Sequence, residues 1–184
     1  MEKQKIQLHD CSFRQYISHQ KILQRISEIA LDIQSQQHSD NPIFVSVLNG
    51  AFMFTADLCK QLSCNPIVTF IKIASYLGTQ STGSLESLFG LDVDVKNKTV
   101  YILEDIIDSG STVHYLYNLY KDLGAKEIFI VCLLFKPKAY KQSIPVYTYG
   151  FEIPNDFVVG YGMDYNGLGR NLKDIYILNE KHND

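Results

Sequence analysis

Residues 100–112 read Val-Tyr-Ile-Leu-Glu-Asp-Ile-Ile-Asp-Ser-Gly-Ser-Thr, and the organisation of the chain follows from this stretch. Its first four residues are apolar and follow the polar breakers at 96–98, a run too short for a helix. That pattern predicts a buried parallel strand. Apolar residues then recur at helical spacing over residues 112–123, and Gly124 ends the segment. The stretch therefore predicts a strand, a short turn and a helix.

Acidic and small polar residues fill the turn between this strand and this helix. Glu104 and Asp105 follow the apolar run, and Asp108 precedes the loop Ser109-Gly110-Ser111-Thr112. Backbone N–H groups at the start of a helix, aided by the positive end of its dipole, bind a monophosphate without a lysine. Carboxylates at a strand end bind the cis-diol of a ribose or a magnesium ion. The turn predicts a phosphorylated-sugar site, and the alternative is an ordinary solvated acidic turn.

Strand-like and helix-like segments alternate through the rest of the chain. Runs rich in β-branched residues predict further strands, and amphipathic runs between them predict helices. The expected strands are 43–48, 66–73, 99–103 and 127–135, and the expected helices are about 12–35, 51–62 and 112–123. This alternation predicts an α/β fold with a mainly parallel twisted sheet flanked by helices.

Two regions depart from the alternation. Residues 74–94 contain three glycines and form a connection long enough to be functional or mobile. The aromatic- and glycine-rich tail, residues 147–184, ends in the strand-like segment 175–178, and we expect it to form a small hood lobe with the N-terminal segment. We expect a single domain over residues 1–184, with a core of about 12–150 and a hood from about 1–11 and 151–184.

The composition excludes several classes of protein. With 184 residues, 46% of them hydrophobic and 20% charged, the chain can form a core and is not a disordered protein. A net charge of −3 weighs against a nucleic-acid partner. The four cysteines lack metal-site spacing, so we expect no structural zinc and a reduced, cytoplasmic setting. No apolar run approaches the ~18 residues that span a bilayer, so we expect no membrane association.

Residues 103–112 resemble the phosphoribosyl pyrophosphate signature of type I phosphoribosyltransferases. From about residue 45 to 178, the chain is similar to the hypoxanthine-guanine (6-oxopurine) phosphoribosyltransferase family. The resemblance implies the type I phosphoribosyltransferase fold and a purine salvage transferase. Such an enzyme joins hypoxanthine, or guanine, to phosphoribosyl pyrophosphate and yields IMP or GMP and pyrophosphate. It also implies Mg²⁺ as cofactor and a homo-oligomer, either a dimer or a tetramer.

The same resemblance assigns the sugar-binding half of the site. Asp108 is implied as the catalytic residue, near the purine N7, where it assists the attack of N9 as proton acceptor or hydrogen-bond partner. Glu104 and Asp105 are implied to hold the ribose hydroxyls and, with Asp164, to be candidate metal ligands. The implied 5′-phosphate site is the loop Ser109, Gly110, Ser111 and Thr112, in which Ser111 replaces a residue that is commonly lysine or apolar in the family.

The resemblance also assigns the pyrophosphate side. Its residues lie on two turns and in the tail, and they are Leu48, Asn49, Gly50, Ser75, Tyr76 and Arg170. Asn49 stands where the family has the lysine of a Leu-Lys-Gly turn, so the backbone role is kept and an ammonium contact is lost. Ser75 and Tyr76 open the family's flexible loop, which closes over pyrophosphate during turnover and excludes water.

Three residues form the implied purine pocket. Lys136 donates to the 6-oxo group, Phe157 stacks on the purine plane, and the backbone of Val158 binds the Watson–Crick edge. Other interpretations stay open from the local sequence. Asn49-Gly50 is equally consistent with a plain turn, and a lysine after a strand is commonly solvated.

Two rival functions remain. One is a nucleotide-sensing regulator with the phosphoribosyltransferase fold that binds RNA or DNA, which the acidic balance disfavours. The other is the same chemistry on a different base, such as xanthine, orotate or adenine.

Overall fold

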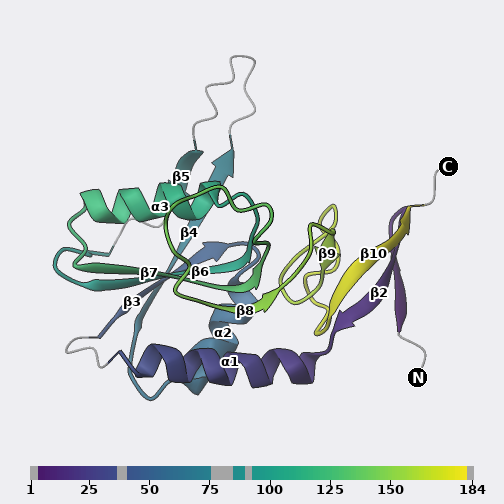
Figure 1. Cartoon of the computed structure of the whole chain (residues 1–184), viewed down its shortest axis with the longest axis horizontal. Helices are drawn as coiled ribbons and strands as arrows, with labels where there is room; N and C mark the ends of the chain where they lie inside the picture. Colours follow the sequence, from purple (N-terminus) through teal and green to yellow (C-terminus); the bar gives the residue numbers. More distant parts are fainter. Residues whose placement is uncertain (1–3, 37–40, 76–84, 90–92, 182–184) are drawn as a thin grey trace, which may run out of the picture.

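The structure is a computed structural model that describes residues 4–36, 41–75, 85–89 and 93–181. The described residues form two sheets, with helices packed on the larger one (Figure 1). The larger sheet has the strand order β5-β4-β3-β6-β7-β8, and the smaller sheet has the order β1-β2-β10-β9. No helix in these described ranges is long and apolar enough to cross a bilayer.

Five neighbouring strands of the larger sheet run parallel to one another. They are β4 (Ile67–Ser75), β3 (Ile43–Leu48), β6 (Thr99–Ile107), β7 (Glu127–Phe135) and β8 (Thr148–Glu152). The edge strand β5 (Leu85–Phe89) pairs with β4 in the antiparallel direction. Parallel pairing brings the carboxyl ends of these strands to one edge of the sheet. The predicted mainly parallel α/β fold is confirmed.

Helices cover both faces of the larger sheet. On one face, α1 (His19–Gln34) and α2 (Phe52–Gln61) pack against strand residues such as Phe44 and Leu103. On the other face, α3 (Ser111–Asp122) packs against the alternate strand residues, among them Ile102. Figure 1 shows the sheet between α3 on one side and α1 and α2 on the other. The alternation follows because successive strand side chains point to opposite faces.

The smaller sheet is the hood, and both ends of the chain contribute to it. Its antiparallel strands are β1 (Lys5–Leu8), β2 (Cys11–Ile17), β10 (Ile175–Lys181) and β9 (Val158–Val159). Phe13, Val159 and Tyr176 form the centre of a small separate core under this sheet. The predicted hood lobe from the N- and C-terminal segments is confirmed.

Several predicted boundaries are wrong. Residues Cys11–Ile17 are not the start of a helix: they form β2 of the hood, and α1 begins at His19. Cys11 and Phe13 are buried on either side of a half-exposed residue, which is the period of a strand. Strand β6 continues past the predicted end at 103 to Ile107, so Glu104 and Asp105 lie within it. The tail residues Thr148–Glu152 form β8, the edge strand of the larger sheet, so the C-terminal part of the hood begins after Glu152.

Candidate functional site

Two adjacent cavities lie at the carboxyl ends of the strands. The smaller, about 100 Å³, is lined by Glu104 and by residues 106–113. The larger, about 280 Å³, lies between the sheet and the hood and is lined by Asp105, Ile106, Asp108, Lys136, Phe157, Val158, Met163, Asp164 and Arg170. Ile106 and Asp108 border both cavities. The fold therefore brings most of the predicted site residues together around Asp108.

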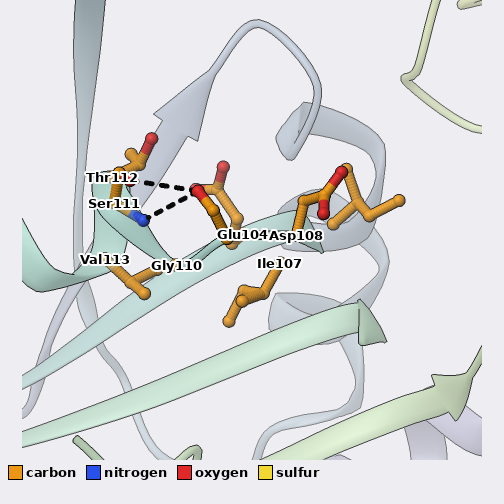
Figure 2. Close-up of a pocket in the computed structure, with 9 residues that line it drawn as sticks. Glu104, Ile107, Asp108, Gly110, Ser111, Thr112 and Val113 are labelled. Carbon is orange, nitrogen blue, oxygen red and sulfur yellow. Dashed lines mark hydrogen bonds between the residues drawn. The ribbon is translucent and has the colours of Figure 1, made fainter. Parts of the chain in front are cut away.

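The loop at the start of α3 forms the wall of the smaller cavity. Gly110 has a left-handed φ of 82°, and a Cβ there would lie 2.4 Å from a ring carbon of Tyr140, so both backbone and packing require glycine. The hydroxyls of Ser109 and Ser111 lie 3.0 Å apart, and the Ser111 N–H donates to Ser109 Oγ at 3.4 Å. Figure 2 shows Ser111 and Thr112 at one end of this cavity and Asp108 at the other.

Residues 140–142 form a second loop that packs against the Ser109–Thr112 loop and donates hydrogen bonds to it. The sequence did not predict this contact. The backbone N–H of Lys141 and the side-chain amide of Gln142 both donate to the Ser109 carbonyl oxygen, at 3.2 and 3.4 Å. Tyr140 and Gln142 also occupy the space that a side chain at position 110 would need. No local motif marks these residues, because their role arises from contacts across about thirty positions of the chain.

The carboxylates of Glu104 and Asp105 are held in a poorly solvated place. Glu104 is 9% exposed, and its Oε2 atom has no hydrogen-bond partner among the described residues. Burial, with the nearby charge of Asp105, raises the pKa of Glu104 well above its usual value. Burial also raises the pKa of Asp105 to about 6, although two backbone N–H groups and Arg170 oppose that shift. Glu104 therefore lacks, at Oε2, a partner that a cationic or hydroxyl-bearing ligand could supply.

Asp108 forms an ion pair with Lys136 across the larger cavity. Lys136 Nζ lies 3.2 Å from Asp108 Oδ2, with side-chain exposures of 9% for the lysine and 60% for the aspartate. The lysine is fixed at the end of β7, where its N–H donates to the Ile107 carbonyl at 2.9 Å. A solvated surface lysine, the alternative that the sequence left open, is therefore excluded at position 136.

The hood supplies an aromatic wall to the larger cavity. Phe157 is 45% exposed, and its ring lies 6.3 Å from that of Phe13 and 5.8 Å from that of Tyr165. Val158 follows in β9 and is buried, with its backbone paired to Ile177. An exposed aromatic face backed by two further rings suits stacking on a planar heterocycle.

The segment 160–170, here called the C-terminal arm, closes the other side of the cavity. Arg170 Nη2 lies 2.6 Å from Asp164 Oδ1, and Arg170 Nη1 donates to the Gly162 carbonyl at 2.8 Å. Gly162 has a φ of 103°, and a Cβ there would lie 2.0 Å from the Gly50 carbonyl oxygen. The arm therefore lies directly on the turn that follows β3.

That turn contains the predicted residues Leu48, Asn49 and Gly50. The Leu48–Asn49 peptide is cis. A Cβ at Gly50 would lie 1.6 Å from Asp105 Oδ2, so only glycine fits between this carboxylate and the arm. Leu48 and Asn49 are not among the described residues that line the two cavities, and Asn49 is exposed.

The remaining predictions on the pyrophosphate side fall at the limit of the described chain. Ser75 is the last residue of β4, where the structure describes its backbone. Tyr76, and most of the loop that it opens, lie outside the described residues.

The three predicted metal ligands, Glu104, Asp105 and Asp164, do not form a preformed coordination site. In the described part of the chain, no group of three histidine, cysteine or acidic side chains is placed to hold a metal. Asp164 is already engaged by Arg170 and by the Gly167 N–H at 2.7 Å. The unpartnered oxygen of Glu104 and the poorly solvated Asp105 nevertheless suit Mg²⁺, which commonly takes one or two carboxylates and completes its shell with water and substrate oxygens.

The chain matches known proteins over most of its length. The family model for the phosphoribosyl transferase domain matches residues 12–166. The hypoxanthine-guanine phosphoribosyltransferase of Bacillus subtilis is 39% identical over 88% of this chain and 91% of its own length. That of Lactococcus lactis is 36% identical over 88% of each chain.

Solved structures agree with these relatives. A hypoxanthine-guanine phosphoribosyltransferase from Bacillus anthracis, with a HEPES molecule in its active site, superposes with a TM-score of 0.83 at 34% identity, over 89% of this chain and 96% of that one. Hypoxanthine phosphoribosyltransferase from Trypanosoma cruzi, in complex with the product IMP, has a TM-score of 0.83 at 30% identity, over 95% and 97% of the two chains.

Proposed function

The chain belongs to the hypoxanthine-guanine phosphoribosyltransferase family, and from that premise we propose how its residues carry out the transfer. The reaction joins hypoxanthine, or guanine, to phosphoribosyl pyrophosphate, and it yields IMP or GMP and pyrophosphate. A bond forms between N9 of the base and C1′ of the ribose while the bond from C1′ to pyrophosphate breaks. The observation that carries the assignment of residues is the position of Asp108, which borders both cavities.

The smaller cavity takes the 5′-phosphate. Its wall is the Ser109–Thr112 loop at the N-terminal end of α3, where backbone N–H groups and the helix dipole favour an anion. Ser111 adds no charge there, so binding relies on these amides and hydroxyls. The bracing of the loop by Gln142 keeps the donors in place before the ligand arrives.

The ribose lies between the two cavities, above Glu104 and Asp105. Its 2′- and 3′-hydroxyls donate to these carboxylates and supply the hydrogen bonds that Glu104 Oε2 lacks. Mg²⁺ held by these carboxylates would neutralise charge on the leaving pyrophosphate. Arg170 provides the forked donors for the same pyrophosphate. The proposal also includes Asp164 as a candidate ligand of Mg²⁺.

The purine enters the larger cavity against Phe157. Lys136 donates to its 6-oxo group, and the Val158 backbone binds its Watson–Crick edge. Because Lys136 is already paired with Asp108, the incoming base takes a place beside an existing hydrogen bond. Asp108 then faces N7 of the imidazole ring and accepts a proton or a hydrogen bond from it as N9 attacks C1′.

The protein is a homo-oligomer in this proposal. Apolar side chains at the start of β4 and at the start of α2 support it, since Ile67, Val68, Phe70 and Phe52 are each at least 40% exposed. A group of exposed large apolar residues favours a protein–protein contact. Light scattering of the purified protein would measure its mass against that of one 21.0 kDa chain.

Pyrophosphate release from phosphoribosyl pyrophosphate, measured with a panel of free bases, tests the function. With Mg²⁺ present, we expect release with hypoxanthine and with guanine, and formation of IMP and GMP. Xanthine is included in the same panel, because release with xanthine alone would favour the rival function, transfer to a different base. A purified, folded protein that releases pyrophosphate with none of these bases would contradict the proposal.

A further inference from the structure

A buried tyrosine connects the C-terminal arm to the helix behind the Gly50 turn. Tyr161 is fully buried, and its hydroxyl donates to Asp57 Oδ2 at 2.6 Å. Asp57 lies 104 positions earlier in the sequence, in α2, the helix that begins directly after the turn. The ring of Tyr161 also packs on that of His19, the first residue of α1, at 6.1 Å between centroids. The arm is thus attached to both helices on one face of the sheet.

The backbone beside Tyr161 holds the groups that would meet pyrophosphate. Gly162 lies on the Gly50 carbonyl, its own carbonyl accepts from Arg170 Nη1, and its N–H donates to the Arg170 carbonyl at 3.0 Å. Tyr161 itself has a left-handed φ of 49°, which a residue with a side chain rarely adopts without contacts that hold it there. The Tyr161 side chain is anchored by the bond to Asp57.

The charges of this pair favour a strong hydrogen bond. Burial alone would raise the pKa of Asp57, but the hydrogen bonds from Tyr161 and Lys60 lower it below the usual value. Burial, and then the contact with Asp57, raises the pKa of Tyr161. The pair is therefore a neutral hydroxyl and an ionised carboxylate at neutral pH, and such charge-assisted bonds are the stronger ones.

We propose that Tyr161 and Asp57 are positioning residues for pyrophosphate: their hydrogen bond holds the C-terminal arm on the Gly50 turn, so that Arg170 meets the leaving group. Neither Tyr161 nor Asp57 lines the two cavities, so each acts through the arm and not by touching substrate. The inference rests on the proposed function, because it takes Arg170 as a pyrophosphate ligand. It predicts a defect on the pyrophosphate side of the site alone.

Tyr161→Phe removes the hydroxyl and keeps the ring. We expect Kd for phosphoribosyl pyrophosphate, measured by calorimetry, to rise about tenfold, as for a lost hydrogen bond to a charged group. Kd for IMP, which carries no pyrophosphate, should stay within about twofold of wild type. Lys60→Met is the matched control, since Lys60 binds the other oxygen of Asp57 at 2.9 Å but is 70% exposed. It should change neither constant.

Asp57 provides the second test, which also holds if Tyr161→Phe fails to fold. Asp57→Asn retains an oxygen that accepts from Tyr161 and should bind phosphoribosyl pyrophosphate more tightly than Asp57→Leu. If Tyr161→Phe binds IMP and phosphoribosyl pyrophosphate equally more weakly, the tyrosine has only a general structural role and the proposal is overturned. Unchanged binding of both ligands would also overturn it. Because calorimetry needs no turnover, a wild-type protein without transfer activity would contradict the proposed function separately.

Discussion

Lys136 Nζ lies 3.2 Å from Asp108 Oδ2, although the two residues are 28 positions apart and directly follow two neighbouring strands. The lysine is buried and the aspartate is exposed, and both line the larger cavity. The residue proposed to recognise the 6-oxo group and the residue proposed to assist N9 are therefore in contact before any ligand binds.

Asp108→Asn should lower turnover by about 10²–10⁴, which is the usual contribution of a positioned proton acceptor. Affinity for phosphoribosyl pyrophosphate should stay close to wild type, because Asp108 is proposed to act on the base and not on the sugar phosphate. Steady-state kinetics with hypoxanthine, together with calorimetry for the sugar phosphate, measures both. A folded variant with near-normal turnover would remove Asp108 from the catalytic role.

Gly110→Ala should weaken phosphoribosyl pyrophosphate binding by at least about tenfold, because the new Cβ would meet Tyr140 at 2.4 Å and move the phosphate loop. Gly124→Ala is its control at the other end of α3. Its φ of 83° matches the 82° of Gly110, but its nearest neighbour would be a flexible lysine carbon at 3.5 Å. Both variants should lose roughly 1 kcal/mol of stability from the left-handed backbone. Equal substrate affinity in the two variants would contradict the role of the loop.

Asp105 makes stability depend on pH in the direction opposite to most aspartates. Its pKa is about 6 in the folded protein, above the value of an unfolded aspartate, so the folded state binds the proton more tightly. Protonated Asp105 therefore adds to the free energy of unfolding at low pH, and this contribution is lost as the pH rises from about 4 through about 6. From pH 5 to pH 8, the unfolding temperature Tm should fall less steeply in Asp105→Asn than in wild type. The reverse order would show that burial does not dominate at this carboxylate.

Removal of divalent metal should abolish turnover and weaken phosphoribosyl pyrophosphate binding, and added Mg²⁺ should restore both. The reason is that Glu104 and Asp105 alone would oppose the negative pyrophosphate. IMP binding, in which no pyrophosphate takes part, should be less sensitive to chelator. Full activity in the presence of excess chelator would contradict Mg²⁺ dependence.

The core of the fold was predictable from sequence because buried parallel strands are continuous apolar runs. The predicted strands 43–48 and 127–135 have the observed bounds of β3 and β7. The N-terminal strand β2 was missed, since Tyr16 and Ile17 also fit the spacing of the helix that follows. Its partner β10 lies more than 150 positions away, and no local pattern reveals that pairing.

The strand, turn and helix around the Ser109–Thr112 loop were predictable, because one contiguous motif carries them. Contacts between distant segments were not. The pairing of Lys136 with Asp108, the Gln142 brace and the Tyr161–Asp57 bond each depend on how helices and loops pack around the sheet. The split of the site into two cavities that share Asp108 likewise appears only in three dimensions.

The most direct test of the account is the specificity constant, kcat/KM, of wild type and Lys136→Met with hypoxanthine and with adenine. An ammonium donates three hydrogen bonds and accepts none, so it complements a 6-oxo group and opposes the 6-amino group of adenine. We expect wild type to prefer hypoxanthine by about 10⁴ or more, and Lys136→Met to lose activity with hypoxanthine and most of that preference. Equal use of adenine and hypoxanthine by the wild-type protein would contradict the account.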